Sequence, residues 1–277
     1  MSRFTRRQPL SIPCPNCNRL ISAKAEKCIH CGLANPGWYA SFPLLNNLLR
    51  GKISFHGGLV LTCFLLYVLA IGLDLPGVVL LGNGLASLSP SNLALEKLGM
   101  GGRIPLLEGR WWTLLTATYL HGSILHILFN MLWLRQIGPL TEELFGASRF
   151  IVLYTAAGVI GAVLSTAAGT PLFVGASGSI FGLFGALIYY GWRRGGTFGS
   201  TIFRRMIYWA GFGLVFGLLT PSVDNWGHVG GFIGGFALAF WMSYQEKKRQ
   251  GLRDHLAALL TLIFIAICFS LMLIAFL

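Results

Sequence analysis

The stretch Gly175-Ala176-Ser177-Gly178 places a serine between two glycines at the start of a long apolar segment. A second apolar segment downstream begins close to His228. A serine hydroxyl needs an adjacent base before it becomes a nucleophile, and a neutral imidazole can accept its proton. Two apolar helices that each carry one such group near the same end predict a serine hydrolase built inside a bilayer.

The composition is typical of a membrane protein. Of the 277 residues, 55% are hydrophobic and 11% are charged, whereas soluble domains carry about 25% charged residues. The run from Phe150 to Trp192 contains no Asp, Glu, Lys or Arg. Because one spanning helix needs about 20 apolar residues, this run predicts two spans, broken at residues 169–171.

Over the whole chain the apolar segments predict seven spans and an all-α polytopic membrane protein. We expect the spans near residues 55–73, 123–140, 149–168, 174–192, 204–220, 226–244 and 256–277. The segment 76–122, between the first two spans, has few charges and two amphipathic patches. We therefore expect it to lie partly in the outer leaflet.

The charge distribution predicts the orientation. The chain has 21 Lys and Arg against 9 Asp and Glu, a net charge of +12. Such a balance would suit nucleic acid, but the basic residues cluster in alternate connections, which is the positive-inside pattern. The expected partner is thus the lipid bilayer and not nucleic acid. We expect a multi-pass protein of the plasma (inner) membrane with the N-terminus cytoplasmic and, after seven spans, the C-terminus outside.

Residues 1–35 are predicted to form a separate cytosolic module. It contains two CxxC pairs with ten residues between them; the cysteines are Cys14, Cys17, Cys28 and Cys31. Four thiolates suit a structural tetrahedral zinc site of ribbon type, with iron as the minor option, and a reducing cytosol disfavours disulfides. Residues 36–52 follow as a juxtamembrane linker, either on the anionic leaflet or as a solvated tether. The membrane domain is expected to cover residues 53–277.

Few polar groups lie within the spans, and such groups are usually functional. His126 and Asn130 are four residues apart, so they share one helix face. Ser177 and His228 begin the fourth and sixth spans, and the predicted topology places all four residues at similar depth. An oxyanion would find donors in the Asn130 amide, the His126 ring and the Ser177 backbone N–H at a helix start.

The neighbours of these residues leave several alternatives open. Asp224 is expected to cap the helix of His228 or to contact its imidazole, and since no acid is well placed, the pair reads as a dyad. Phe181 is expected to stack on His228 or to pack in the core. His121 is interpreted as a gate or an interfacial residue, and Ser179 as a packing residue.

Glycines predict which spans pack most closely. Gly178 and Gly182 line the fourth span, and Gly227, Gly231 and Gly235 line the sixth at four-residue spacing. Small residues at this spacing let helix backbones approach each other. Spans four and six are therefore expected to form a close pair.

Three stretches resemble the motifs of the rhomboid intramembrane serine proteases: His121–Asn130 (HGSILHILFN), Gly175–Gly178 and His228–Gly235 (HVGGFIGG). The resemblance covers about residues 53–277. It implies a six-helix bundle plus one C-terminal helix.

For chemistry, the resemblance implies Ser177 as nucleophile and His228 as base, with His126 and Asn130 as oxyanion donors. It also implies cleavage of transmembrane protein substrates near the outer leaflet without a cofactor in the active site. The sequence departs from the family where Thr113 follows Trp112, because the family often has Arg there. The alternative is a catalytically silent relative that binds and escorts membrane helices.

Overall fold

A computed structural model describes residues 11–14, 17–40, 54–78 and 88–276. The chain divides into two compact units, Met1–Ser54 and Phe55–Leu277. Of the expected linker 36–52, helix α1 (Pro36–Ala40) is described, and residues 41–52 lie outside the described part.

The first unit is built on a small antiparallel hairpin. Strand β1 (Ser11–Pro13) pairs with β2 (Leu20–Ser22), and Ile12 stands opposite Ile21. Both isoleucines are buried and pack with Cys14 and Cys28. This apolar core is minimal, and small units of this size commonly depend on a metal or a disulfide for stability.

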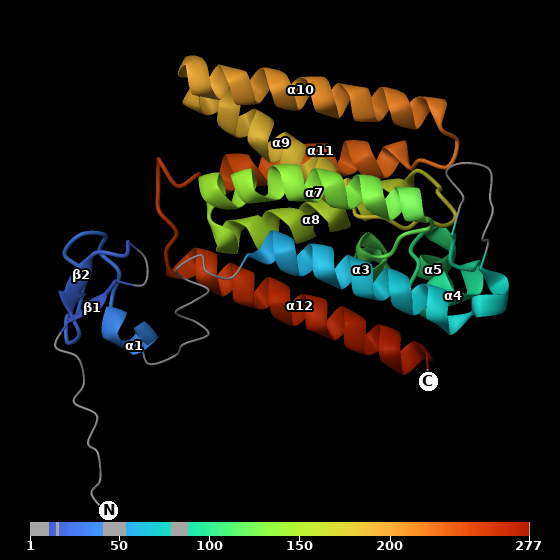
Figure 1. Ribbon diagram of the computed structural model, residues 1–277, viewed down its shortest axis with the longest axis horizontal. Helices are drawn as coiled ribbons and strands as arrows, with labels where there is room; N and C mark the ends of the chain where they lie inside the picture. The colour runs from blue at the N-terminus through green and yellow to red at the C-terminus, as the bar shows by residue number, and fades with distance from the viewer. Residues whose placement is uncertain (1–10, 15–16, 41–53, 79–87, 277) are drawn as a thin grey trace, which may run out of the picture. The chain divides into compact units, whose positions relative to one another are not determined.

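The second unit is a bundle of helices that alternate in direction (Figure 1). In the described residues its long helices are α3 (Phe55–Leu73), α7 (Ile124–Phe145), α8 (Ala147–Ala167), α9 (Ser177–Arg194), α10 (Gly196–Leu219), α11 (Asn225–Met242) and α12 (Leu252–Phe276). Each corresponds to one expected span, so the all-α architecture is confirmed.

Four of these helices, α3, α8, α10 and α12, are long and apolar enough to cross a membrane. The other three, α7, α9 and α11, carry the candidate site residues. Because α7, α9 and α11 all pack against α8, they lie in the same layer as a helix that qualifies as a span. The chain is therefore a polytopic helical membrane protein.

Helices α9 and α11 are in direct backbone contact. A Cβ added to Gly231 would lie 2.0 Å from the carbonyl oxygen of Gly178, and one added to Gly235 would lie 1.9 Å from that of Gly182. No side chain fits between helices at this separation. The expected close pairing of the fourth and sixth spans is confirmed.

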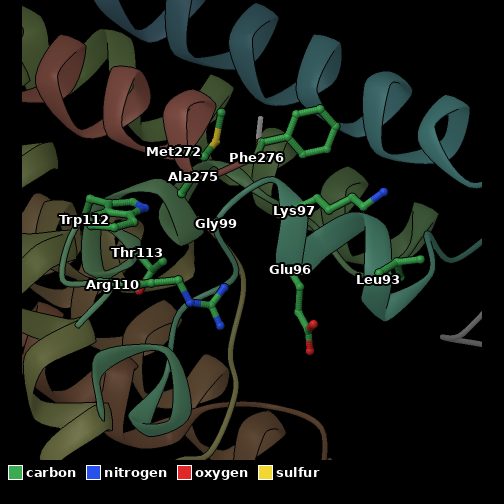
Figure 2. A pocket seen from close by; sticks show the side chains of 10 residues that line it. All are labelled: Leu93, Glu96, Lys97, Gly99, Arg110, Trp112, Thr113, Met272, Ala275 and Phe276. Carbon is green, nitrogen blue, oxygen red and sulfur yellow. Dashed lines mark hydrogen bonds between the residues drawn. The ribbon is translucent and has the colours of Figure 1, made fainter. Parts of the chain in front are cut away.

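Short elements connect α3 to α7 at one end of the bundle. They are η1 (Leu75–Gly77), α4 (Asn92–Lys97), α5 (Arg103–Leu107), α6 (Thr113–Thr116) and η3 (Ala117–Tyr119). Gly101 forms a β-bridge with Phe173 in the α8–α9 connection. A cavity lies between α4, the start of α6 and the last turn of α12 (Figure 2).

At the opposite end a buried ion pair joins the start of α8 to the start of α12. Arg149 Nε lies 2.8 Å from Asp254 Oδ1, and its Nη2 lies 3.1 Å from Oδ2. The Nη1 group donates to the Lys248 carbonyl over 2.8 Å. Beside this pair, Ser148 Oγ lies 2.8 Å from His255 Nδ1. The C-terminal helix is thus attached to the bundle by polar contacts as well as by packing.

Candidate functional site

The imidazole of His126 is held by the turn that starts α7. Ser123 caps this helix, because its hydroxyl accepts a hydrogen bond from the His126 backbone N–H over 3.2 Å. The Gly122 N–H points to His126 Nδ1 over 3.4 Å. Since Nδ1 accepts there, the neutral ring carries its proton on Nε2. The turn thus leaves an Nε2 donor free for another partner.

The side chains of His126 and Ser177 both lie close to Gly175. A Cβ added to Gly175 would lie 2.7 Å from His126 Nε2 and 3.7 Å from Ser177 Oγ. Gly175 also has a φ of +136°, which disfavours a side chain. The glycine before the serine is therefore required both by its backbone conformation and by the approach of the His126 ring.

Ser177 is the first residue of α9. The N–H groups of a first helical turn have no partner within the helix, so the backbone here offers a donor. A cavity of about 20 Å³ borders Ser177, between Gly175, Gly178, Asp224 and Gly227. Roughly 10–15 Å³ is enough for one water molecule. The space that Ser177 lines thus has the size of a single water.

His228 lies in the first turn of α11, where Asp224 caps the helix. The Asp224 carboxylate accepts from the Gly227 N–H over 3.0 Å, as the capping alternative predicted. The His228 ring stacks on Phe181, with centroids 4.2 Å apart and an interplanar angle of 11°. Because Phe181 follows Ser177 by four residues, this contact places His228 over the face of α9 that bears the serine.

In the described part of the chain no hydrogen bond joins the Ser177 hydroxyl to the His228 imidazole. Nor does His228 Nδ1 have a hydrogen-bond partner there, so no carboxylate orients the ring. Catalytic hydrogen bonds are often long before substrate binds. The orientation of His228 therefore comes from stacking on Phe181.

Asn130 is buried on the same face of α7 as His126, one turn further along the helix. Its Nδ2 group donates to the His126 carbonyl oxygen over 3.0 Å. An amide nitrogen carries two protons, so one N–H remains for a second acceptor. Gly175 thus lies close to both the His126 ring and Ser177. Phe181 links His228 to α9 by stacking on its ring. Asn130 is hydrogen-bonded to the backbone of His126.

The interfacial interpretation of His121 is wrong. Its side chain is fully buried, and its ring packs edge-on against His126 with centroids 5.1 Å apart. Tyr119 and Leu120 before it are also buried, because this connection folds into the bundle. Ser179 is buried beside Gly158, as expected for a packing residue.

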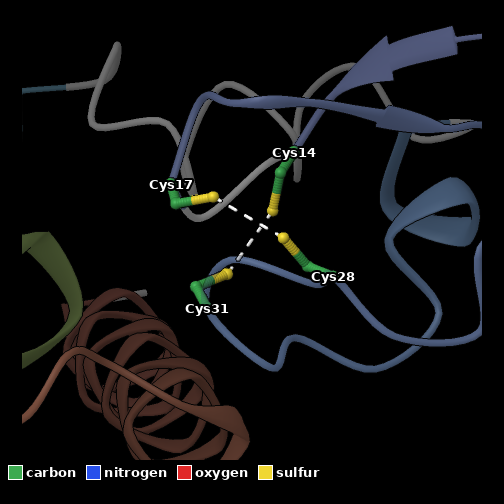
Figure 3. Close-up of side chains that lie close together, drawn as sticks. All are labelled: Cys14, Cys17, Cys28 and Cys31. Atoms are coloured by element: carbon green, nitrogen blue, oxygen red, sulfur yellow. Dashed lines mark hydrogen bonds between the residues drawn. The ribbon is translucent and has the colours of Figure 1, made fainter.

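The four cysteines of the first unit form a separate cluster (Figure 3). Cys14 Sγ lies 3.6 Å from Cys31 Sγ, and Cys17 Sγ lies 3.6 Å from Cys28 Sγ. All four sulfurs lie within 4.8 Å of one another. Thiolates around tetrahedral zinc, with Zn–S bonds of about 2.3 Å, are roughly 3.8 Å apart. The arrangement therefore fits a four-coordinate metal.

Local backbone geometry builds this cluster. The N–H of Asn18 bonds the Cys14 carbonyl over 2.9 Å, and that of Gly32 bonds the Cys28 carbonyl over 2.8 Å. Asn18 and Gly32 both have positive φ, so each cysteine pair sits on the same kind of turn. Burial raises the pKa of the Cys28 thiol, but backbone hydrogen bonds from His30 and Cys31 outweigh it and lower that pKa to about 7. Burial and the neighbouring cysteines instead raise the pKa of the Cys31 thiol to about 12, so Cys28 is the more readily deprotonated of these two ligands.

These features define a class: a helical membrane protein whose serine and histidines gather at one end of the bundle. Comparison with known sequences identifies the class further. The rhomboid domain matches residues 108–245. The chain is 32% identical over 153 residues to the putative rhomboid protease YdcA of Bacillus subtilis, of which it covers 76%. The chain belongs to the rhomboid family.

Two other relatives are longer than the matched region. The chain is 38% identical over 155 residues to the rhomboid protease GluP of Bacillus subtilis, a match of 56% of this chain and 31% of GluP. It is 37% identical over 158 residues to RHOMBOID-like protein 7 of Arabidopsis thaliana, of which it covers 50%. The chain therefore spans about a third of GluP and half of the plant relative.

Proposed function

We propose that the protein is an intramembrane serine endopeptidase with Ser177 as nucleophile and His228 as general base. The observation that carries the proposal is the stacking of His228 on Phe181, one helical turn after Ser177. This contact brings the base of α11 to the face of α9 that bears the hydroxyl. Membership of a family whose relatives include named proteases supports the same reaction.

In the first step the Ser177 Oγ attacks the substrate carbonyl carbon while His228 accepts the hydroxyl proton. The resulting tetrahedral intermediate collapses when the imidazolium gives that proton to the leaving amine. A water molecule then hydrolyses the acyl-enzyme with His228 again as base. The small cavity beside Ser177 has room for this water.

The oxyanion of each tetrahedral intermediate is proposed to face three donors. They are the His126 Nε2–H, the free N–H of the Asn130 amide and the Ser177 backbone N–H. The hydrogen bond at Nδ1 fixes the tautomer that the first donor requires. Each preorganised donor of this kind lowers the barrier by about 3 kcal/mol.

The substrates proposed are transmembrane protein segments, cut near the outer leaflet. The basic connections predict a cytoplasmic N-terminus and an outer C-terminus, which assigns the end of the bundle holding Ser177 to the outer side. In the cytosolic unit, we propose zinc as the structural metal of the four cysteines. Zinc there would add stability to a unit with a minimal apolar core and is not needed for the reaction at Ser177.

Labelling with a fluorophosphonate probe, which reacts with activated serines, tests the proposal. Wild-type protein in detergent is expected to be labelled, and Ser177→Ala and His228→Ala are expected to lose the label. Ser179→Ala, which changes a packing serine two residues away, is the matched control and should retain it. An unlabelled wild type beside a labelled control protease would instead indicate a silent helix-binding relative.

A further inference from the structure

The cavity between α4, α6 and α12 has both charged and apolar walls. Its volume is about 280 Å³, close to the lower end of the roughly 300–1,000 Å³ of ligand pockets. The lining residues that matter here are Glu96, Lys97, Arg110, Trp112, Met272 and Phe276. No residue of the candidate catalytic site lines it, so this is a distinct place on the molecule.

The charged wall presents both signs to one opening. Figure 2 shows the Arg110 guanidinium and the Glu96 carboxylate extending into it from two sides. Arg110 pairs with Glu108 through Nη2, which leaves its other N–H groups available. Within the described residues neither Glu96 nor Lys97 has an ion-pair partner, and Lys97 Nζ lies 5.4 Å from the centroid of the Phe276 ring. The cavity thus presents the free N–H groups of Arg110 on one side and the Glu96 carboxylate on another, while the Lys97 amine extends away from Arg110.

The apolar wall belongs to the last turn of a lipid-facing helix. Only 11% of the apolar window of α12 is buried inside the protein, so most of this helix meets the bilayer. Met272 and Phe276 extend the helix surface into the cavity. Because these residues lie at the end of a helix of spanning length, the cavity opens where acyl chains meet head groups.

We propose that this cavity binds a phospholipid whose head group carries a phosphate and a primary ammonium. The phosphate faces Arg110, the ammonium faces Glu96, and the acyl chains follow α12. A head group with both charges matches the wall better than an anionic one, which would leave Glu96 without a partner. The lipid comes from the leaflet at the end of the bundle that holds Ser177.

Native mass spectrometry of the full chain tests the assignment with defined lipids. Delipidated protein is offered phosphatidylethanolamine, phosphatidylglycerol or phosphatidylcholine of identical acyl chains. Wild type is expected to retain one phosphatidylethanolamine about tenfold more tightly than either other lipid. Equal retention of all three lipids would overturn the proposal.

Variants separate the two charges. Glu96→Gln is expected to abolish the preference for phosphatidylethanolamine over phosphatidylglycerol while phosphatidylglycerol still binds. Arg110→Gln should weaken both lipids about tenfold or more. Arg103→Gln, an exposed arginine of the same connection outside the cavity, is the control. An equal loss in Arg103→Gln would mean non-specific attraction to the surface and would refute the site.

Two further measurements test whether the variants fold and whether the ligand is a lipid or a soluble head group. Unchanged thermal unfolding of each variant without lipid shows that the variants fold, and a variant that fails this is replaced by Glu96→Ala or Arg110→Ala. Glycerophosphoethanolamine, the soluble head group, should not bind at concentrations where the lipid saturates. Binding of this soluble compound as tightly as the lipid would contradict a bilayer source. None of these outcomes depends on whether Ser177 is a nucleophile.

Discussion

The Arg149–Asp254 pair offers the sharpest test of how α12 is attached. Arg149 has 2% of its side chain exposed and Asp254 has 19%, and the guanidinium makes two bonds to the carboxylate and two to the Lys248 and Arg249 carbonyls. Removing one partner of a buried pair costs about 3–5 kcal/mol, because the other charge stays buried without compensation. The exposed fraction of Asp254 places the expected cost of Arg149→Ala at the lower bound, about 3 kcal/mol.

The assay is thermal unfolding in detergent, followed by loss of the monodisperse peak in size-exclusion chromatography. A loss of about 3 kcal/mol lowers the midpoint by roughly 6–12 °C for a chain of this size. The control is Arg194→Ala, which breaks a pair of similar length, 3.0 Å to Glu246, with 33% and 50% of the side chains exposed. Exposed pairs contribute little to stability, because water screens both charges. Equal midpoints for the two variants would refute the argument from burial.

Two other changes test the packing and the metal. Gly231→Ala places a Cβ 2.0 Å from a backbone carbonyl of α9, whereas Gly211→Ala meets nothing within 4 Å. We expect the first to lower stability by about 1–3 kcal/mol and the second to leave the unfolding midpoint within a degree or two; the opposite order would contradict the close packing. Cys14→Ser should lower bound zinc, measured by elemental analysis of the purified protein, while Ser177 keeps its probe reactivity. Full zinc content in Cys14→Ser would contradict the four-cysteine site.

Sequence periodicity located the helices well, because a span is a long apolar run with few alternatives. The largest error was the start of α10, expected near residue 204 and observed at Gly196. Arg204 and Arg205 both lie inside the helix, where long basic side chains can extend toward water. The turn before it depends on Gly195, with φ of +64°, a conformation that the sequence does not display.

For the candidate site, too, the sequence predicted some features and not others. Motif spacing pointed to Ser177, His126 and His228 because polar groups in apolar spans are rare. It could not show that Gly175 must admit the His126 ring, nor that His121 is buried against the same ring. Both facts arise from how the connection before α7 folds over the bundle, and that is a property of tertiary packing. Periodicity within one segment carries no information on such contacts.

The glycine seam between α9 and α11 has a consequence for how this protein can vary. The backbones of α9 and α11 are in direct contact at that seam. A change of rotamer or of side-chain volume there therefore cannot bring the two helices closer together. The Ser177 hydroxyl and the His228 imidazole are therefore carried by a helix pair, α9 and α11, that behaves as one rigid unit. Differences in substrate choice among relatives built this way would have to arise in the surrounding helices and connections, which can be remodelled while the helix pair stays fixed.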